Sequence, residues 1–127
     1  SGLVVDALDG APGVHSARYS GENSTDEVRN QKLLHALKDI PYSQRTARFQ
    51  CAIAMADKEG KIEVVEGVCQ GEIAHQPKGD QGFGYDPVFV PDGYQQTFAQ
   101  LGATVKNRIS HRWRALALAA KVVQNWI

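Results

Sequence analysis

The stretch TARFQCAIAMA, residues 46–56, alternates so regularly that it restricts the chain to folds that contain a sheet. Successive side chains of a β-strand point to opposite faces, so every second residue shares a face. The apolar residues at these positions are Ala47, Phe49, Cys51, Ile53 and Met55. The turn DKEGK follows, and IEVVEGVCQGEIA then continues as a second extended run. We therefore predict a long antiparallel hairpin over residues 46–74.

The second arm of this hairpin contains two glycines, Gly67 and Gly71. Glycine inside a strand weakens it, and it marks either a bulge or a close approach of another backbone. The sequence is compatible with both explanations.

The residues before the hairpin predict one strand and one helix. Residues 3–8 are typical of a short strand, and a loop rich in Gly and Pro follows them. A helix is predicted from Ser24, because Ser24 and Glu27 have the spacing of a capping box, and Pro41 lies beyond its end. The apolar face of this helix would consist of Val28, Leu33, Leu34 and Leu37.

The C-terminal part of the chain predicts a second, longer amphipathic helix. Its apolar residues recur at spacings of 4 and 3, which is the period of one helix face. They are Ile109, Trp113, Leu116, Ala120, Val123 and Ile127. The resulting fold class is α/β (α+β): a mixed β-sheet with a long antiparallel hairpin, flanked by helices. We expect residues 1–127 to form a single domain, a size that can bury its own core.

Composition restricts the partners of the chain. Lys plus Arg and Asp plus Glu both number 14, so the formal net charge is zero. Nucleic-acid-binding proteins normally show a basic excess, and we therefore expect no nucleic acid partner, although a small phosphorylated ligand needs only a few local charges.

Cysteine usage and hydropathy indicate the compartment. Cys51 and Cys69 have neither CxxC spacing nor neighbouring histidines, so we expect buried free thiols in a reducing compartment rather than a zinc site. No apolar run approaches the length of a membrane span, and no signal-peptide pattern opens the chain. We therefore expect a cytoplasmic protein without a membrane partner.

The stretch QGFGYDPVF, residues 81–89, places an aromatic ring between two glycines. Phe83 could be approached closely from either side, as a flat surface against which a planar ligand lies, and Asp86 could accept hydrogen bonds from ring N–H groups. A turn rich in glycine, with Phe83 directed into the core, explains the pattern equally well.

The stretch KNRISHR, residues 106–112, gathers basic residues at the start of the final helix. These are Lys106, Arg108, His111 and Arg112. A helix N-terminus favours negative charge, so a basic cluster there suggests a site for an anion. The alternative is a solvated basic turn.

Three stretches together resemble one family. SGLVVDALDGAPGVHSARYSGE, GFGYDPVF and ISHRWRAL occur in the order and approximate spacing of the inosine triphosphate pyrophosphatase family. Members of that family hydrolyse non-canonical purine nucleoside triphosphates to the monophosphate and pyrophosphate. The resemblance implies a truncated inosine-triphosphatase-like fold, because family members carry a longer N-terminal region than this sequence.

The resemblance also implies which residues bind a purine nucleotide. They are Ser1, Phe83, Gly84, Tyr85, Asp86, Lys106, His111 and Arg112. Phe83 would be a stacking surface for the base, whereas His111 and Arg112 would read the 6-oxo group of hypoxanthine or xanthine. Donors facing that oxygen would reject adenine, whose 6-amino group is itself a donor. Ser1 matches the serine of a DDSG motif.

The family's cofactor and its catalytic acid belong to segments that this sequence does not match. The resemblance implies magnesium, but the family's metal carboxylates, its phosphate-binding motif and its acidic pair precede the serine that corresponds to Ser1. We therefore expect no metal ligands in this chain and leave its catalytic residues unassigned. Trp113 also stands where the family usually has a small residue.

Two functions remain open from the sequence. The chain could be the base-recognising portion of a purine nucleoside triphosphate pyrophosphatase, active on inosine, xanthosine or deoxyinosine triphosphate once the missing elements are supplied. Alternatively, it could be a non-catalytic purine-nucleotide-binding or dimeric assembly module that retains the fold. Family members are typically homodimers, and exposed sheet edges tend to pair with another chain, so we expect a homodimer in either case.

Overall fold

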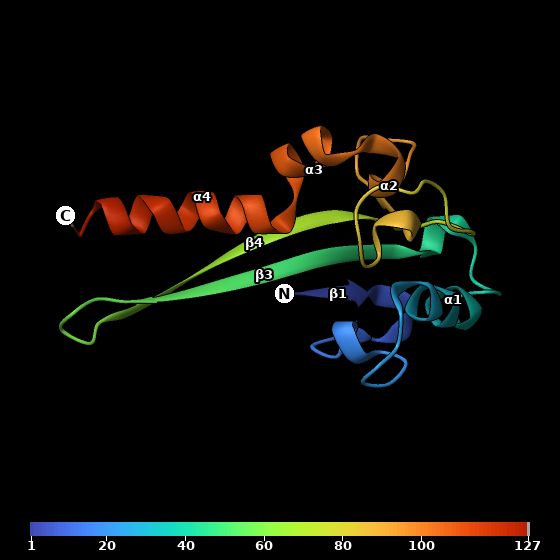
Figure 1. Ribbon diagram of the computed structural model, residues 1–127, viewed down its shortest axis with the longest axis horizontal. Coiled ribbons are helices and arrows are strands. Elements are labelled where there is room, and N and C mark those ends of the chain that lie inside the picture. The colour runs from blue at the N-terminus through green and yellow to red at the C-terminus, as the bar shows by residue number, and fades with distance from the viewer. Residues whose placement is uncertain (127) are drawn as a thin grey trace.

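The computed structural model describes residues 1–126 as one five-stranded sheet with helices packed around it (Figure 1). The strands are β1 (Gly2–Val5), β2 (Pro12–Gly13), β3 (Thr46–Ala56), β4 (Ile62–Ile73) and β5 (Phe89–Pro91). The α-helices are α1 (Asp26–Ala36), α2 (Phe98–Leu101), α3 (Ala103–Ile109) and α4 (His111–Gln124). Short 3-10 helices are η1 (Asp6–Leu8), η2 (Ser16–Arg18), η3 (Tyr42–Gln44) and η4 (Asp86–Val88).

The predicted hairpin is confirmed as β3 and β4, and it organises the sheet. The strand order is β2-β1-β3-β4-β5, and each neighbouring pair is antiparallel. Within β3, only residues 47–50 pair with β1, and within β4, only residues 71–73 pair with β5. The remaining length of the hairpin therefore projects from the sheet as a two-stranded ribbon, with α4 lying along it (Figure 1). The predicted α/β (α+β) class, a sheet with a long hairpin and flanking helices, is confirmed, but the sheet is antiparallel between all of its described strands and not mixed.

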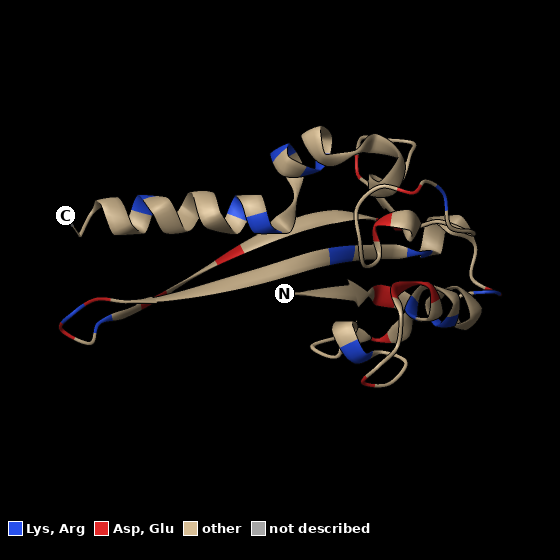
Figure 2. Ribbon diagram, viewed as in Figure 1, with Lys and Arg blue, Asp and Glu red and all other residues tan. Residues whose placement is uncertain are grey.

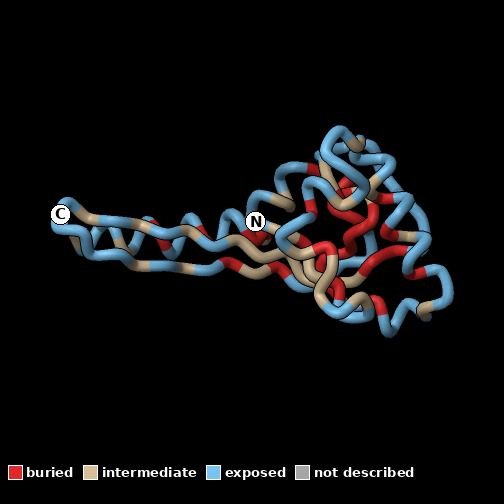
Figure 3. Tube along the Cα trace, turned by 90° about the horizontal axis from the view of Figure 1, so that it is seen from below, coloured by how far each residue is buried: buried red, intermediate tan, exposed pale blue. Residues whose placement is uncertain are grey.

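The hydrophobic core lies at the end of the molecule away from the hairpin turn (Figure 3). Its fully buried residues come from β1, β4, β5 and the second half of α1 with its C-cap. They include Leu3, Val5, Leu33, Leu37, Ile73 and Phe89. The ribbon and α4 are largely exposed by comparison (Figure 3).

A buried arginine joins the end of α1 to the end of β4. Arg45 is 2% exposed, and its guanidinium donates to the carbonyls of Ile40 (2.8 Å), Leu37 (2.6 Å) and Ala74 (3.1 Å). Burial lowers the pKa of this side chain. Its N–H groups therefore find partners in carbonyls at and after the C-cap of α1 and just after β4, which would otherwise lack donors.

The start of α1 differs from the prediction by one residue. Thr25 is the N-cap, and its hydroxyl accepts from the Val28 N–H at 3.2 Å. The Ser24 hydroxyl instead donates to the Gly21 carbonyl, so the capping box predicted for Ser24 and Glu27 is wrong. Both residues can cap a helix, and the preceding turn decides which one does. Of the predicted apolar face, Leu33 and Leu37 are fully buried, Leu34 is partly buried and Val28 is exposed.

The N-terminal strand is also shorter than predicted. β1 ends at Val5, and residues 6–8 form the 3-10 helix η1. Asp6 there accepts hydrogen bonds from Thr46 (2.8 Å) and Arg48 (3.3 Å) of β3, which fixes the turn beside the sheet.

The apolar face predicted for the C-terminal helix is wrong. Ile109 belongs to α3, Ser110 is the N-cap of α4, and Ile127 lies outside the described residues. The large side chains of that face are exposed: Trp113 53%, Leu116 57% and Val123 41%. The face that packs on the hairpin is instead formed by His111, Ala115 and Ala119.

Glycine in β4 explains this choice of face. A Cβ on Gly67 would overlap the His111 carbonyl and the Ala115 backbone, and one on Gly71 would overlap the Val90 carbonyl. The close backbone approach predicted at these glycines is therefore confirmed. Because α4 lies so near to β4, alanine side chains fit between the helix and the hairpin beside the flat ring of His111, and the large apolar side chains point away.

Both cysteines are free thiols, as predicted. Cys69 is buried and Cys51 partly buried, and burial raises the pKa of the Cys69 thiol to about 11. Within residues 1–126, no helix has the length and apolar character needed to cross a bilayer. The cytoplasmic location stays a prediction.

We expect Gly67→Ala to lower the free energy of unfolding by about 2 kcal/mol, because the added methyl group must push α4 away from β4. Urea denaturation of the purified chain measures the change. Glu66→Ala is the matched control: it alters the adjacent, exposed residue and should change stability by less than about 0.5 kcal/mol. Equal stability of Gly67→Ala and the parent would contradict the packing of α4 on Gly67.

Candidate functional site

An open cavity of about 1300 Å³ lies where the beginning of β1, the loop before η4 and the helices α3 and α4 meet. All eight site residues predicted from the sequence line it: Ser1, Phe83, Gly84, Tyr85, Asp86, Lys106, His111 and Arg112. The structure thus brings together stretches that are up to 111 residues apart in the chain.

Phe83 presents its ring to this cavity. The side chain is 57% exposed, although it is large and apolar. The Lys106 Nζ lies 4.0 Å from the ring centroid, and the Arg112 guanidinium carbon lies 5.6 Å from it. Both distances are within the range of cation–π attraction. The interpretation that directed Phe83 into the core is therefore wrong, since the ring lies on the cavity surface.

The side chain of Asp86 holds the loop that carries Phe83. The carboxylate is buried, and its Oδ2 accepts from the Phe83 N–H (3.1 Å) and from Lys106 Nζ (2.6 Å). Gly82 has φ +80° and a Cβ there would overlap the same carboxylate, so the position requires glycine. Asp86 therefore shapes the loop and fixes Lys106, and its Oδ2 is already occupied.

Tyr85 is part of the wall and of the core. Its hydroxyl donates to the Ser16 carbonyl at 2.6 Å, and burial raises its pKa to about 12. The side chain is 6% exposed. Tyr85 therefore anchors the loop to η2 and remains protonated at neutral pH.

Two residues that the sequence analysis did not identify fix the backbone of Gly84. The Gly84 N–H donates to Asp26 Oδ2 (2.9 Å), and its carbonyl accepts from Asn30 Nδ2 (3.1 Å). The hydrogen bond from Gly84 is the largest cause of the lowered pKa of Asp26, and Arg29 lowers it further. Both residues lie on one side of α1, four positions apart. That spacing is a local signal, but their partner is more than 50 residues away.

His111 is a buried, neutral base at the first turn of α4. Its ring stacks on Phe49 with centroids 5.0 Å apart and 14° between the planes. Its Nε2 lies 2.6 Å from the Ser1 hydroxyl, whereas its buried Nδ1 has no hydrogen-bond partner. Burial, followed by the charges of Arg112 and Lys106, lowers its pKa to about 4. At neutral pH the ring therefore carries no charge.

More basic than acidic side chains line the cavity: among the described residues, two of its four Lys and Arg side chains pair with its two carboxylates, and the other two form no ion pair. Lys106 and Arg108 near the end of α3 and Arg112 at the start of α4 line it, and Figure 2 shows basic segments in both helices near their junction. Arg29 of α1 also lines the cavity. This arrangement favours an anionic ligand. The anion site at residues 106–112 stays a prediction, because Arg108 and Arg112 are exposed, as they would also be in a solvated basic turn.

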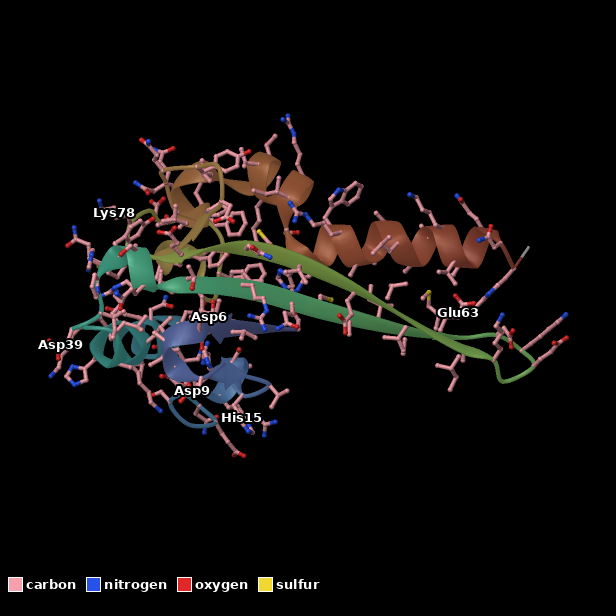
Figure 4. The ribbon with its side chains drawn as sticks, turned by 180° about the vertical axis from the view of Figure 1, so that it is seen from behind. Asp6, Asp9, His15, Asp39, Glu63 and Lys78 are labelled. Atoms are coloured by element: carbon pink, nitrogen blue, oxygen red, sulfur yellow. The ribbon has the colours of Figure 1, made fainter. Side chains whose placement is uncertain are left out.

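The residues present do not fit a magnesium ion, which binds through several carboxylate or carbonyl oxygens. The carboxylates at the cavity, Asp26 and Asp86, already hold the loop that carries Phe83 and a basic side chain each. Asp6, Asp9 and Glu63 lie elsewhere, beside the first strand or along the hairpin (Figure 4). Among residues 1–126, no three His, Cys, Asp or Glu side chains are grouped to hold a metal.

Comparison with known proteins gives consistent matches. The sequence profile of the Ham1 family matches residues 1–122. A dITP/XTP pyrophosphatase of Desulforamulus reducens is 52% identical over 123 residues, 97% of this chain and 61% of the relative. The Staphylococcus aureus Ham1 protein has a TM-score of 0.93 and 41% identity, over 99% of this chain and 65% of that one. The nucleoside-triphosphatase (dITP/XTP pyrophosphatase) of Mycobacterium abscessus has a TM-score of 0.82 and 50% identity, covering 94% and 61%. The chain thus spans roughly three fifths of the length of these relatives.

The lowered pKa of His111 predicts a loss of stability in acid. Below pH 6.5 the unfolded chain binds a proton at this residue, whereas the native ring stays neutral until about pH 4. The free energy of unfolding should therefore fall as the pH is lowered through this window, on the order of 2–3 kcal/mol in all. Above pH 6.5 the residue contributes no pH dependence.

Urea denaturation at several pH values, comparing the parent with His111→Gln, measures this effect. The variant should lose less stability than the parent between pH 7 and pH 4. His35→Gln removes an exposed histidine from α1 and should behave like the parent. Parallel pH profiles for the parent and His111→Gln would show that the buried ring titrates normally.

Proposed function

The chain belongs to the Ham1 family, and we propose that it forms the base-recognising part of a pyrophosphatase acting on non-canonical purine nucleoside triphosphates. The products would be the nucleoside monophosphate and pyrophosphate. The relatives named above as dITP/XTP pyrophosphatases support this substrate class. Inosine, deoxyinosine and xanthosine nucleotides share a 6-oxopurine, and this shared chemistry is what the cavity must recognise.

The observation that carries the proposal is the exposed ring of Phe83 on the wall of a basic cavity. A purine base can stack on this ring, and stacking on an aromatic side chain contributes about 1–3 kcal/mol per base. The phosphates of the same nucleotide would meet the basic residues that line the cavity, including Arg29 and Arg108. A ligand that is planar at one end and anionic at the other fits both features.

Recognition of the 6-oxo group would come from Arg112 and His111. The Arg112 guanidinium lies beside the Phe83 ring and consists of donors alone, so it suits a carbonyl oxygen and not an amino group. His111 is uncharged and is held by Ser1, which supports a role in directional hydrogen bonding. Gly84, Tyr85 and Asp86 would shape the loop, and Asp86 would keep Lys106 at the ring.

Catalysis would need chemical groups other than the side chains that line this cavity. Pyrophosphate release requires an oriented water molecule and neutralised phosphate charge, which magnesium commonly supplies. The acidic side chains at the cavity already accept hydrogen bonds from the loop that carries Phe83, so they are not free to hold a metal ion. The same observation favours the alternative, a purine-nucleotide-binding module without catalysis.

We further infer that residues 1–127 act as one domain and associate as a homodimer. A single buried cluster, drawn from β1, α1, β3, β4 and β5, supports one folding unit. The face of the hairpin opposite α4 supports association, because it is a row of exposed apolar side chains. This hairpin face consists of Ala52, Ala54, Ala56, Ile62 and Val64.

Calorimetric titration with inosine monophosphate tests the base site. We expect Phe83→Ala to weaken binding about tenfold, because the stacking surface is lost. Tyr94→Ala is the matched control, since Tyr94 is an exposed aromatic residue that does not line the cavity, and it should bind like the parent. Absence of binding by the parent would refute the proposed base site.

An assay of inosine triphosphate hydrolysis with magnesium separates the two functions for this chain. Because the described cavity offers no group of free carboxylates, we expect the 127-residue chain to bind nucleotide without turnover. Adding a polypeptide with the parts of the relatives that this chain does not span should restore turnover if the chain belongs to an enzyme. Turnover by the chain alone would overturn our account of the cavity's acidic groups.

Sedimentation equilibrium tests the homodimer. We expect Val64→Asp to weaken association, because it places a charge in the middle of the hairpin face. Lys58→Ala at the exposed hairpin turn should leave the mass unchanged. A parent chain that sediments as a monomer at all concentrations would contradict the proposal.

A further inference from the structure

A second aromatic side chain lines the same cavity as Phe83. Trp113 is 53% exposed, which is unusual for the largest apolar side chain. It immediately follows Arg112, whose guanidinium lies over the Phe83 ring. The cavity thus has two exposed aromatic surfaces, one from the loop before η4 and one from α4.

The position of Trp113 is fixed by the helix that carries it. Its backbone N–H donates to the Ser110 hydroxyl at 3.2 Å, so it lies in the capped first turn of α4. Residues of a helix are about 100° apart around its axis. Because His111 packs toward Phe49 and the sheet, Trp113 two positions later points away from the sheet. Its side chain therefore lines the cavity instead of filling the core.

The chemistry around Trp113 favours a planar ligand that carries negative charge. An exposed indole ring keeps a large apolar surface in contact with water. An aromatic ligand that stacks on the ring removes this surface from water, which is favourable. Arg29 and Arg108 line the same cavity and suit the phosphates of such a ligand. A purine nucleotide combines the two properties in one molecule.

We propose that Trp113 is a second base-contacting surface of the nucleotide site, and that it favours two-ring purines over one-ring pyrimidines. This inference rests on the proposed function, because it assumes that the base enters this cavity. A purine offers more ring area than a pyrimidine to a large indole surface. Phe83 and Trp113 together would thus set the size of the base, whereas Arg112 and His111 would read its 6-oxo edge.

Fluorescence of Trp113 itself tests the contact. The chain has two tryptophans, Trp113 and Trp126, so Trp126→Phe leaves Trp113 as the single emitter. We expect inosine monophosphate to quench this emission with the same midpoint as the binding heat of the same variant. Uridine monophosphate should bind about tenfold more weakly.

Substitutions at Trp113 separate stacking from simple apolar bulk. Trp113→Leu keeps an apolar side chain but removes the ring, and it should weaken inosine monophosphate binding about tenfold while affecting uridine monophosphate less. Trp113→Phe keeps a ring and should remain within about threefold of the parent. Leu118→Ala is the control, since Leu118 is an exposed residue of the same helix that does not line the cavity.

Three results would overturn the inference in distinguishable ways. Binding heat without any change in Trp113 emission, or unchanged affinity in Trp113→Leu, would refute the role of Trp113 and leave the proposed function intact. Absence of binding heat in the parent would refute the base site and Trp113 with it. Emission that depends on protein concentration but not on nucleotide would assign Trp113 to contact between two copies of the chain.

Discussion

The close packing of α4 on Gly67 of β4 determines the geometry of the cavity. It brings the first turn of α4 against the sheet, so that His111 stacks on Phe49 and loses most of its contact with water. The same contact turns the large residues Trp113 and Leu116 outward, where they line the cavity. The close approach at Gly67 thus accompanies both the burial of His111 and the exposure of Trp113 on the cavity wall.

The loop that carries Phe83 is held by hydrogen bonds between side chains and its backbone. Asp86 binds the backbone of Phe83 from below, whereas Asp26 and Asn30 bind the backbone of Gly84 from α1. Each of these contacts ends on backbone atoms, so the loop geometry does not depend on the identity of Phe83. Preorganised loops lose less entropy when they bind a ligand, because the ordering has occurred during folding. The ring can therefore stay exposed without the loop collapsing over it.

The sequence predicts those features that depend on local periodicity. The alternation of residues 46–56 gave the hairpin, and the order of three motifs gave the family. Features that depend on tertiary contacts were not predictable in the same way. The spacing of Ile109, Trp113 and Leu116 is that of a helix face, yet the close approach at Gly67 selects the face of small residues. The pairing of Asp86 with Lys106, 20 residues away, likewise depends on the fold, and it assigns the carboxylate to the loop instead of the ligand.

The charge distribution in the cavity follows from these constraints. Lys106 is paired with Asp86, so its charge is largely compensated. His111 is uncharged because of its burial and its basic neighbours. Among the described residues, Arg112 forms no ion pair, and its guanidinium beside the Phe83 ring is therefore free to donate. A free donor near a stacking surface discriminates by hydrogen bonding, because a ligand edge that accepts gains a bond and one that donates leaves both groups unpaired. The proposed preference for a 6-oxopurine over adenine thus rests on Arg112, which has no acidic partner among the described residues, and not on Lys106, which is paired with Asp86.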